Sequence, residues 1–372
     1  MQMQPDALDK VRQFFIINQM EPTIDLVSDV VRDLFPASSQ YELVGLVDQA
    51  ISSLFGMGPL EQLLLRPGIT DILVNRFDDI WVNVGTELAK TDVSFVSEQA
   101  AREFAIQLAV RGHRRLDELH PFVDMQLPNG MRFHAVLPPL AVNGTAISIR
   151  VPAPALLTLA DLFGDGFMNS SMYRMLIDII ANRQSFLISG GTGSGKTTLL
   201  AAMLSLVDPS NRILVIEDAT ELNINHPHVV AVQSRLANSE GLGQISMTDL
   251  VRQSLRMRPD RIVVGEVRGR EISDLLLALN TGHNGSATTI HANSISTVPT
   301  RIEALGLLAG LPREAIHSQM ISAFEYVIQL SDFQNGRRGI ANIAKFKQGP
   351  DGLVVIESLI DSGVSSDIQL VA

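Results

Sequence analysis

A glycine-rich loop constrains this sequence more than any other feature. Residues 190–197 are Gly-Gly-Thr-Gly-Ser-Gly-Lys-Thr, with an apolar run before them and a helical pattern after them. Glycines let backbone N–H groups face phosphate oxygens at the positive end of the following helix. In such a loop, Lys196 reaches the β- and γ-phosphates and the Thr197 hydroxyl binds Mg²⁺. We therefore expect a site for ATP and Mg²⁺ formed by Gly190, Gly191, Thr192, Gly193, Ser194, Gly195, Lys196, Thr197 and Thr198.

Two further buried-type strands run into acidic residues. One is followed by Glu217 and Glu221, and the other by Gly265 and Glu266. Acids at the carboxyl ends of strands lie where ligands bind in open α/β sheets. Glu217 and Glu221 could therefore hold Mg²⁺ or order a water, although solvated acids at a helix start would give the same pattern. Gly265 replaces the aspartate usual in a metal-binding strand, so Glu266 is the candidate to polarise the attacking water.

Histidines and arginines near these motifs are weaker signals. His283 and His291 bracket a short predicted strand. We interpret His283 as structural and His291, at the strand end, as a site residue; two histidines without further ligands make a poor zinc site. Arg268 follows the second acidic strand, and Arg132 and Arg150 lie on the polar faces of predicted strands. Arginines from a neighbouring domain or subunit can stabilise a transferring phosphoryl group, but surface charge is an equal alternative.

The hydrophobic pattern changes along the chain and predicts its organisation. Helical spacing comes first, alternating strands follow, and strand–loop–helix units come last, which indicates a mostly parallel α/β sheet. Val151-Pro152-Ala153-Pro154 suits a stiff linker. The predicted regions are a helical segment (1–55), an α+β domain (56–150), a linker (151–158) and an α/β domain (159–372).

Composition excludes several classes of protein. The 372 residues contain no cysteine, which rules out disulfides and thiolate metal sites. The net charge of -11 argues against nucleic acid as the main partner. No stretch reaches the ~20 apolar residues of a membrane span. We expect a cytoplasmic protein that meets a membrane only through partners.

Taken together, the motifs resemble those of the type II/type IV secretion system ATPase superfamily, and most of all the Tad (Flp-type) pilus assembly ATPases. The family calls its motifs Walker A, Asp box, Walker B and His box. The likeness covers about residues 55–350, and the absence of cysteine matches a shorter branch without the four-cysteine zinc insertion. The segments that carry it are residues 58–61, 70–75, 138–140, 190–198, 216–222, 255–261, 265–269 and 281–293.

The resemblance implies a RecA-like ATPase domain preceded by a smaller α+β domain, in a ring homohexamer with nucleotide between the two domains. It implies that Glu266 is the catalytic carboxylate, that Glu221 assists at Mg²⁺ and water, and that His291 approaches the γ-phosphate. Hydrolysis would drive an inner-membrane platform protein in pilus assembly or secretion. One alternative is a conjugation or type IV secretion ATPase. Another is a nucleic-acid translocase, although the negative net charge of the chain argues against it.

Overall fold

The computed structural model describes most of the chain from residue 56 onward. The described residues are 56–362 without 65, 67, 86, 128–129, 152–155, 236, 238–241 and 334–336, together with 24–36, 39 and the single residues 7, 10, 11, 14, 15, 42, 43, 46, 47 and 50. The predicted linker prolines lie outside this set, and so do Pro128 and Asn129 of the sequence Pro128-Asn129-Gly130, which is typical of a hairpin turn. The chain divides into two compact units, Met1–Pro152 and Ala153–Ala372.

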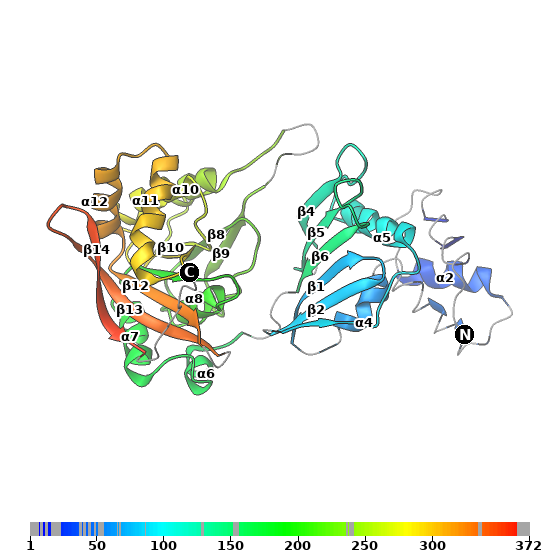
Figure 1. Ribbon diagram of the computed structural model, residues 1–372, viewed down its shortest axis with the longest axis horizontal. Helices are drawn as coiled ribbons and strands as arrows, with labels where there is room; N and C mark the ends of the chain where they lie inside the picture. Colours follow the sequence, from blue (N-terminus) through cyan, green and yellow to red (C-terminus); the bar gives the residue numbers. More distant parts are fainter. Residues whose placement is uncertain are drawn as a thin grey trace, which may run out of the picture. The chain divides into compact units, whose positions relative to one another are not determined.

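The first unit contains an antiparallel sheet in the order β3-β2-β1-β6-β5-β4 (Figure 1). Its strands are β1 (Ile69–Arg76), β2 (Asp79–Val84), β3 (Glu87–Lys90), β4 (Phe122–Gln126), β5 (Arg132–Val136) and β6 (Ala146–Arg150). Alternate side chains such as Phe133 and Ile149 are buried together with residues of α5 (Glu98–Arg111). Ser97, a residue type favoured at helix starts, caps α5 by accepting a hydrogen bond from the Ala100 N–H.

Shorter helices complete the first unit. They are α2 (Ile24–Leu34), the 3₁₀ turn η1 (Gly58–Leu60) and α4 (Glu61–Leu64). The helical spacing of Val27, Val30 and Val31 correctly predicts α2, since all three are buried in one cluster. This first unit is therefore an α+β structure in the part that the structure describes.

The second unit is built on an eight-stranded sheet in the order β14-β13-β12-β7-β11-β10-β8-β9. Its strands are β7 (Phe186–Gly190), β8 (Ile213–Glu217), β9 (Val229–Gln233), β10 (Arg261–Val264), β11 (Ala287–His291), β12 (Tyr326–Asp332), β13 (Arg338–Gln348) and β14 (Val354–Asp361). All pairs from β12 to β9 are parallel, whereas β13 and β14 add an antiparallel edge. The predicted mostly parallel α/β sheet is confirmed.

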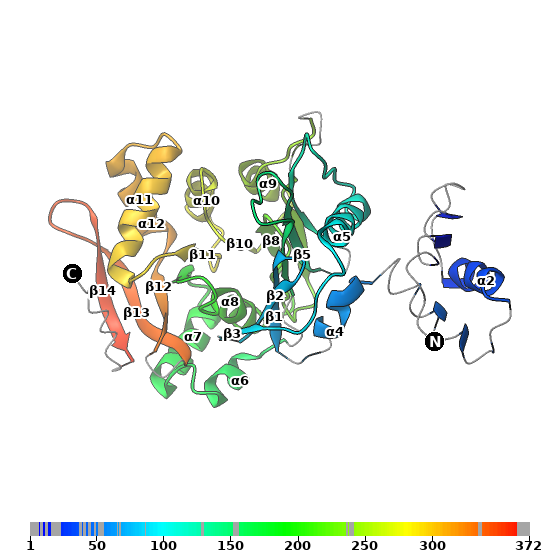
Figure 2. The same cartoon turned by 45° about the vertical axis from the view of Figure 1, so that its right-hand side comes forward.

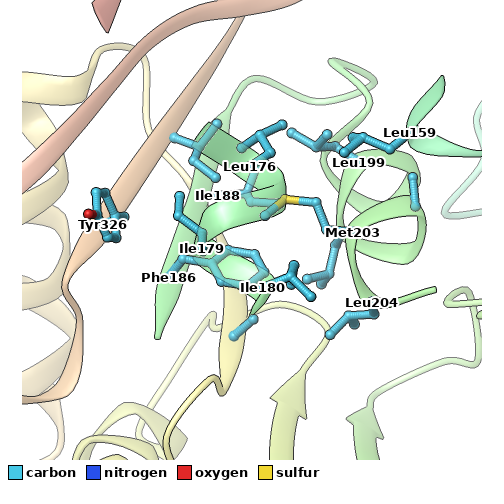
Figure 3. Close-up of a cluster of buried hydrophobic side chains, with 14 of the residues drawn as sticks. Leu159, Leu176, Ile179, Ile180, Phe186, Ile188, Leu199, Met203, Leu204 and Tyr326 are labelled. Carbon is cyan, nitrogen blue, oxygen red and sulfur yellow. The ribbon is translucent and has the colours of Figure 1, made fainter. Parts of the chain in front are cut away.

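Helices cover both faces of this sheet (Figure 2). Residues of α6 (Leu159–Gly164), α7 (Ser170–Ala181) and α8 (Lys196–Leu204) share one core, and those of α9 (Met247–Ser254), α10 (Glu271–Leu279), α11 (Val298–Leu308) and α12 (Arg313–Ala323) share the other. In β7, Phe186 and Ile188 enter the first core and Leu187 the second. Figure 3 shows Ile188 among Leu176, Leu199 and Met203. Because β7 is buried on both faces, its first three residues, Phe186, Leu187 and Ile188, are all apolar.

Two helix ends differ from the sequence pattern. The sequence Ser246-Met247-Thr248-Asp249 is typical of a capping box, and it does start α9. Pro259 predicts the end of that helix, but α9 already ends at Ser254. The helical pattern that begins at Lys196 continues to Leu206, whereas α8 ends at Leu204, because a turn follows in which the Leu206 N–H donates to Met203 O. Among the described residues, no helix is both long enough and apolar enough to cross a membrane.

Candidate active site

The predicted site residues of the second unit follow one edge of its sheet. Parallel strands present their carboxyl ends at the same edge, where ligands bind in open α/β folds. β7 ends at Gly190, β11 at His291 and β8 at Glu217, and Glu266 follows β10 directly after Gly265. The strand order β7-β11-β10-β8 therefore places the loop, the histidine and the two acids in one row.

The glycines of the loop are required by backbone geometry. Gly193 and Gly195 have φ of +72° and +95°, a region that residues with a Cβ rarely adopt. At Gly190, a Cβ would lie 2.6 Å from Ser194 Oγ and 3.1 Å from a backbone oxygen of β12. Helix α8 begins at Lys196, so the loop is bounded by N–H groups that have no intrahelical acceptor and by the positive end of the helix dipole. This geometry fits a phosphate group.

Lys196 is buried beneath the loop. Its Nζ lies 3.1 Å from Gly190 O, 2.7 Å from Gly191 O and 3.3 Å from His291 Nδ1. Burial lowers the pKa of Lys196 from its ordinary value, Glu266 opposes that shift and Arg268 adds to it. The ammonium therefore has an acceptor for each of its N–H groups, and two of the three are carbonyl oxygens of the loop.

Glu266 lies between a histidine and an arginine. Its Oε1 is 2.8 Å from His291 Nε2, at ion-pair distance but without the alignment of a hydrogen bond, and its Oε2 accepts a 2.6 Å hydrogen bond from Arg268. Burial and then Lys196 lower the pKa of His291 more than Glu266 raises it, so the imidazole is neutral near pH 7. An ammonium can only donate to Nδ1, so the proton of the neutral ring belongs on Nε2, the nitrogen that lies 2.8 Å from Glu266 Oε1.

Thr289 holds the backbone on both sides of Glu266. Its Oγ1 donates to Gly265 O at 2.7 Å, and its own carbonyl accepts from Val267 N–H at 3.0 Å. Thr289 is fully buried in β11, two residues before His291. The sequence alone did not single out this residue. The signal that could have found it is a hydroxyl inside a buried strand, because a buried hydroxyl must have a hydrogen-bond partner.

Glu217 is buried at the carboxyl end of β8. Its Oε1 accepts hydrogen bonds from the N–H groups of Glu221 (3.2 Å) and Leu222 (3.0 Å), which closes the turn after β8. Burial, opposed by these two bonds, raises the pKa of Glu217 to about 7. A Cβ at Gly265 would lie 2.8 Å from Glu217 Cγ. Packing against Glu217 thus explains why glycine stands where other strands of this type carry aspartate.

Thr197 and Glu221, the other two predicted Mg²⁺ ligands, are less buried than Glu217. Glu221 is exposed and Thr197 half-buried at the start of α8. A hydroxyl and a single exposed carboxylate suit Mg²⁺, which keeps several waters and takes further oxygens from phosphates. Among the described residues, no group of three or more His, Asp or Glu side chains could hold a metal by itself. His283 Nδ1 lies 3.0 Å from Ala278 O at the end of α10, in keeping with a structural role.

Arg132 and Arg150 lie together in the first unit. They are directly opposite each other in the β5–β6 pair. Arg132 forms two hydrogen bonds with Asp124 (3.1 and 2.7 Å), and Arg150 Nε lies 3.2 Å from Asp71. Burial alone would raise the pKa of Asp124, but Arg132 outweighs it and keeps that pKa low. Like charges opposite each other in a sheet are unfavourable, and the two aspartates offset that cost.

Comparison with known proteins gives consistent matches across most of the chain. A family model described as Type II/IV secretion system protein matches residues 54–354. A protein of Mycobacterium tuberculosis (strain H37Rv), whose name proposes a role in conjugal transfer, is 48% identical over 324 residues, which is 85% of this chain and 92% of that protein. The conjugal transfer protein TrbB of Rhizobium radiobacter is 33% identical over 226 residues, 60% of this chain and 67% of TrbB.

Solved structures share the fold at lower identity. The pilus retraction motor PilT with bound ADP matches with a TM-score of 0.52 and 20% identity, over 79% of this chain and 80% of PilT. The ATPase DotB of Legionella pneumophila matches with a TM-score of 0.51 and 22% identity, over 76% of this chain and 78% of DotB. The expected combination of a RecA-like α/β unit with an N-terminal α+β unit is thereby confirmed as a known fold.

Proposed function

This chain belongs to the Type II/IV secretion system protein family, and from that premise we propose that it hydrolyses ATP with Mg²⁺ to drive a pilus or secretion machine. One observation carries the proposal: the row Lys196–His291–Glu266, with separations of 3.3 and 2.8 Å, borders a phosphate-type loop. A cation, a neutral imidazole and a carboxylate are in contact there, contributed by the start of α8, the end of β11 and the segment that follows β10.

The residues divide the work by position. Lys196 and the N–H groups of the loop hold the β- and γ-phosphates, since oxygens of a phosphate compete well with the loop carbonyls for the ammonium protons. Glu266 polarises the attacking water, and a positioned base of this kind contributes ~10²–10⁴-fold. His291 Nε2, which lies 2.8 Å from Glu266 Oε1, can donate to an oxygen of the γ-phosphate. Mg²⁺, held by Thr197 and water with Glu221 nearby, would neutralise charge on the phosphates.

Arg268 and the arginine pair of the first unit are the candidates for transition-state charge. Arg268 is tied to Glu266 and is half exposed, so it can move toward a phosphate. Arg132 and Arg150 concentrate two guanidinium groups at one place. We propose that this pair completes the site in a homohexamer that acts on an inner-membrane platform protein, an arrangement in which nucleotide binding and assembly support each other.

The machine served is proposed to be a Tad (Flp-type) pilus. The motif likeness and the absence of cysteine support this choice. A conjugation or type IV secretion ATPase is the second candidate, because relatives with 48% and 33% identity are named for conjugal transfer. Deleting the gene separates the two: loss of surface pili seen by electron microscopy supports the first, and loss of plasmid transfer with pili intact supports the second.

Phosphate release tests the activity itself. Lys196→Ala should abolish turnover, and Glu266→Gln should keep ATP binding while slowing hydrolysis. Lys347→Ala is the matched control, since Lys347 pairs with Glu357 on the exposed antiparallel edge. Turnover that survives in Lys196→Ala would remove the phosphate-loop assignment. A nucleic-acid translocase would instead show turnover that DNA stimulates.

A further inference from the structure

An arginine at the start of β13 lies beside the glycine-rich loop. β12 and β13 form an antiparallel pair in which Asp332 is opposite Arg338, so Arg338 lies at the carboxyl end of β12. β12 runs parallel to β7, the strand that leads into the loop. Arg338 therefore shares the sheet edge of the site although it is 145 residues from Gly193 in sequence, and no sequence motif marks it.

The guanidinium group reaches the loop across the end of β12. Its Nη2 lies 4.0 Å from the position that a Cβ would occupy on Gly193. The Nε lies 3.6 Å from Asp332 Oδ1, and about a third of the side chain is exposed. Because Gly193 carries no side chain, the guanidinium lies beside the backbone of the loop at this residue.

The strand that carries Arg338 is packed firmly against the loop. A Cβ on the next residue, Gly339, would lie 2.7 Å from Phe167 O, and Ile340 N–H donates to that same oxygen at 2.8 Å. The Phe167 ring in turn lies 3.4 Å from the Cβ position of Gly195. Strand β13, Phe167 and the loop are thus packed together, which holds the backbone next to Arg338 in place beside the loop.

The order of the strands gives a bound nucleotide a direction. The reacting groups, Glu266 and His291, lie on the β11–β10 side of the loop, whereas Arg338 lies on the β12–β13 side. The terminal phosphate must face Glu266 for hydrolysis, so the rest of the nucleotide extends toward β12. We propose that Arg338 binds the α- and β-phosphates, which ADP and ATP share, as a second cationic ligand. This inference rests on the proposed ATPase function.

Such a contact has a defined kinetic consequence. An interaction made equally with ADP, ATP and the transition state changes affinity but leaves the rate at saturation unaltered. A planar guanidinium suits the paired oxygens of a diphosphate better than an ammonium does. Arg338 should therefore set the affinity for nucleotide before and after hydrolysis, whereas Glu266 should set the rate of hydrolysis.

The test is nucleotide binding by the full chain, measured by calorimetry with Mg-ADP and, in a Glu266→Gln background, with Mg-ATP. Arg338→Gln should weaken both by about tenfold to a hundredfold, as expected for losing a hydrogen bond to a charged group. The rate at saturating ATP, measured with Glu266 intact, should be unchanged. Arg337→Gln, at the exposed neighbouring residue, is the matched control and should bind like the wild type.

Other results overturn the inference in distinguishable ways. Wild-type affinity in Arg338→Gln would refute it while leaving the ATPase proposal intact, and so would a lower saturated rate with unchanged ADP affinity. A wild-type chain that binds neither nucleotide would refute the ATPase proposal itself. If Arg338→Gln does not fold, judged by its unfolding midpoint without nucleotide, Arg338→Lys decides: weaker binding of both nucleotides supports the contact, and wild-type binding overturns it.

Discussion

Glu217→Gln should make the nucleotide-binding unit more stable at high pH than the wild type. The side chain is buried and its pKa is raised to about 7 from 4.5. The glutamine oxygen can still accept the N–H groups of Glu221 and Leu222, so the substitution removes charge and keeps the turn. This variant therefore isolates the cost of ionising a buried carboxyl group.

The sign and size follow from linkage. Below pH 4.5 the carboxyl is protonated in both the folded and the unfolded chain and contributes nothing. Between pH 4.5 and 7 only the folded chain keeps the proton, so the stability of the wild type falls as pH rises, and it levels off above 7. The difference of 2.5 pKa units corresponds to about 3 kcal/mol. The advantage of Glu217→Gln should grow by that amount from pH 4.5 to pH 8.

Urea unfolding from pH 4.5 to 8.5 measures the effect, and the sequence supplies an internal control. The only tryptophan, Trp81, lies in the first unit, so its fluorescence should show the same transition in both proteins while circular dichroism shows the shift. Glu314→Gln, at an exposed position of α12, should not reproduce it. A difference that is constant with pH would refute the argument. If Glu217 is instead a Mg²⁺ ligand, the variant would require far more Mg²⁺ for turnover.

Three further expectations concern neighbouring residues. Thr289→Val should lower the rate at saturating ATP by up to about tenfold, the value of one buried hydrogen bond, with KM unchanged. Thr288 is buried beside it and makes only a 3.3 Å local hydrogen bond, so Thr288→Val should leave the rate unchanged. Equal effects of the two substitutions in a phosphate-release assay would show that Thr289 has no positioning role. Gly265→Ala should cost about 1–3 kcal/mol in urea unfolding, because its Cβ overlaps Glu217; wild-type stability would contradict that packing. Arg132→Gln and Arg150→Gln should each lower turnover. If assembly completes the site, the specific activity of the wild type should fall on dilution. A protein that is monomeric by light scattering and keeps full activity in both variants would refute the hexamer proposal.

The sequence by itself determined the parts of this protein that depend on local pattern. The loop at residues 190–197 required glycines with positive φ, and the apolar run before it could only be a strand buried on both faces. Capping at Ser97 and Ser246 was also predictable, because a cap depends on residues within one turn. The grouping of Glu266 and His291 near the loop followed from parallel strands ending at a common edge.

Only the tertiary structure decided which groups touch. The sequence could not show that Glu217 fills the space beside Gly265 or that Thr289 holds both peptide groups around Glu266. Nor could it show that Arg338, at the start of β13, lies beside Gly193 in the loop after β7. Each of these contacts joins strands far apart in the chain, so it depends on strand order and register. Local spacing fixes the chemistry of a strand or a loop, whereas its neighbours are set by how the whole sheet is assembled.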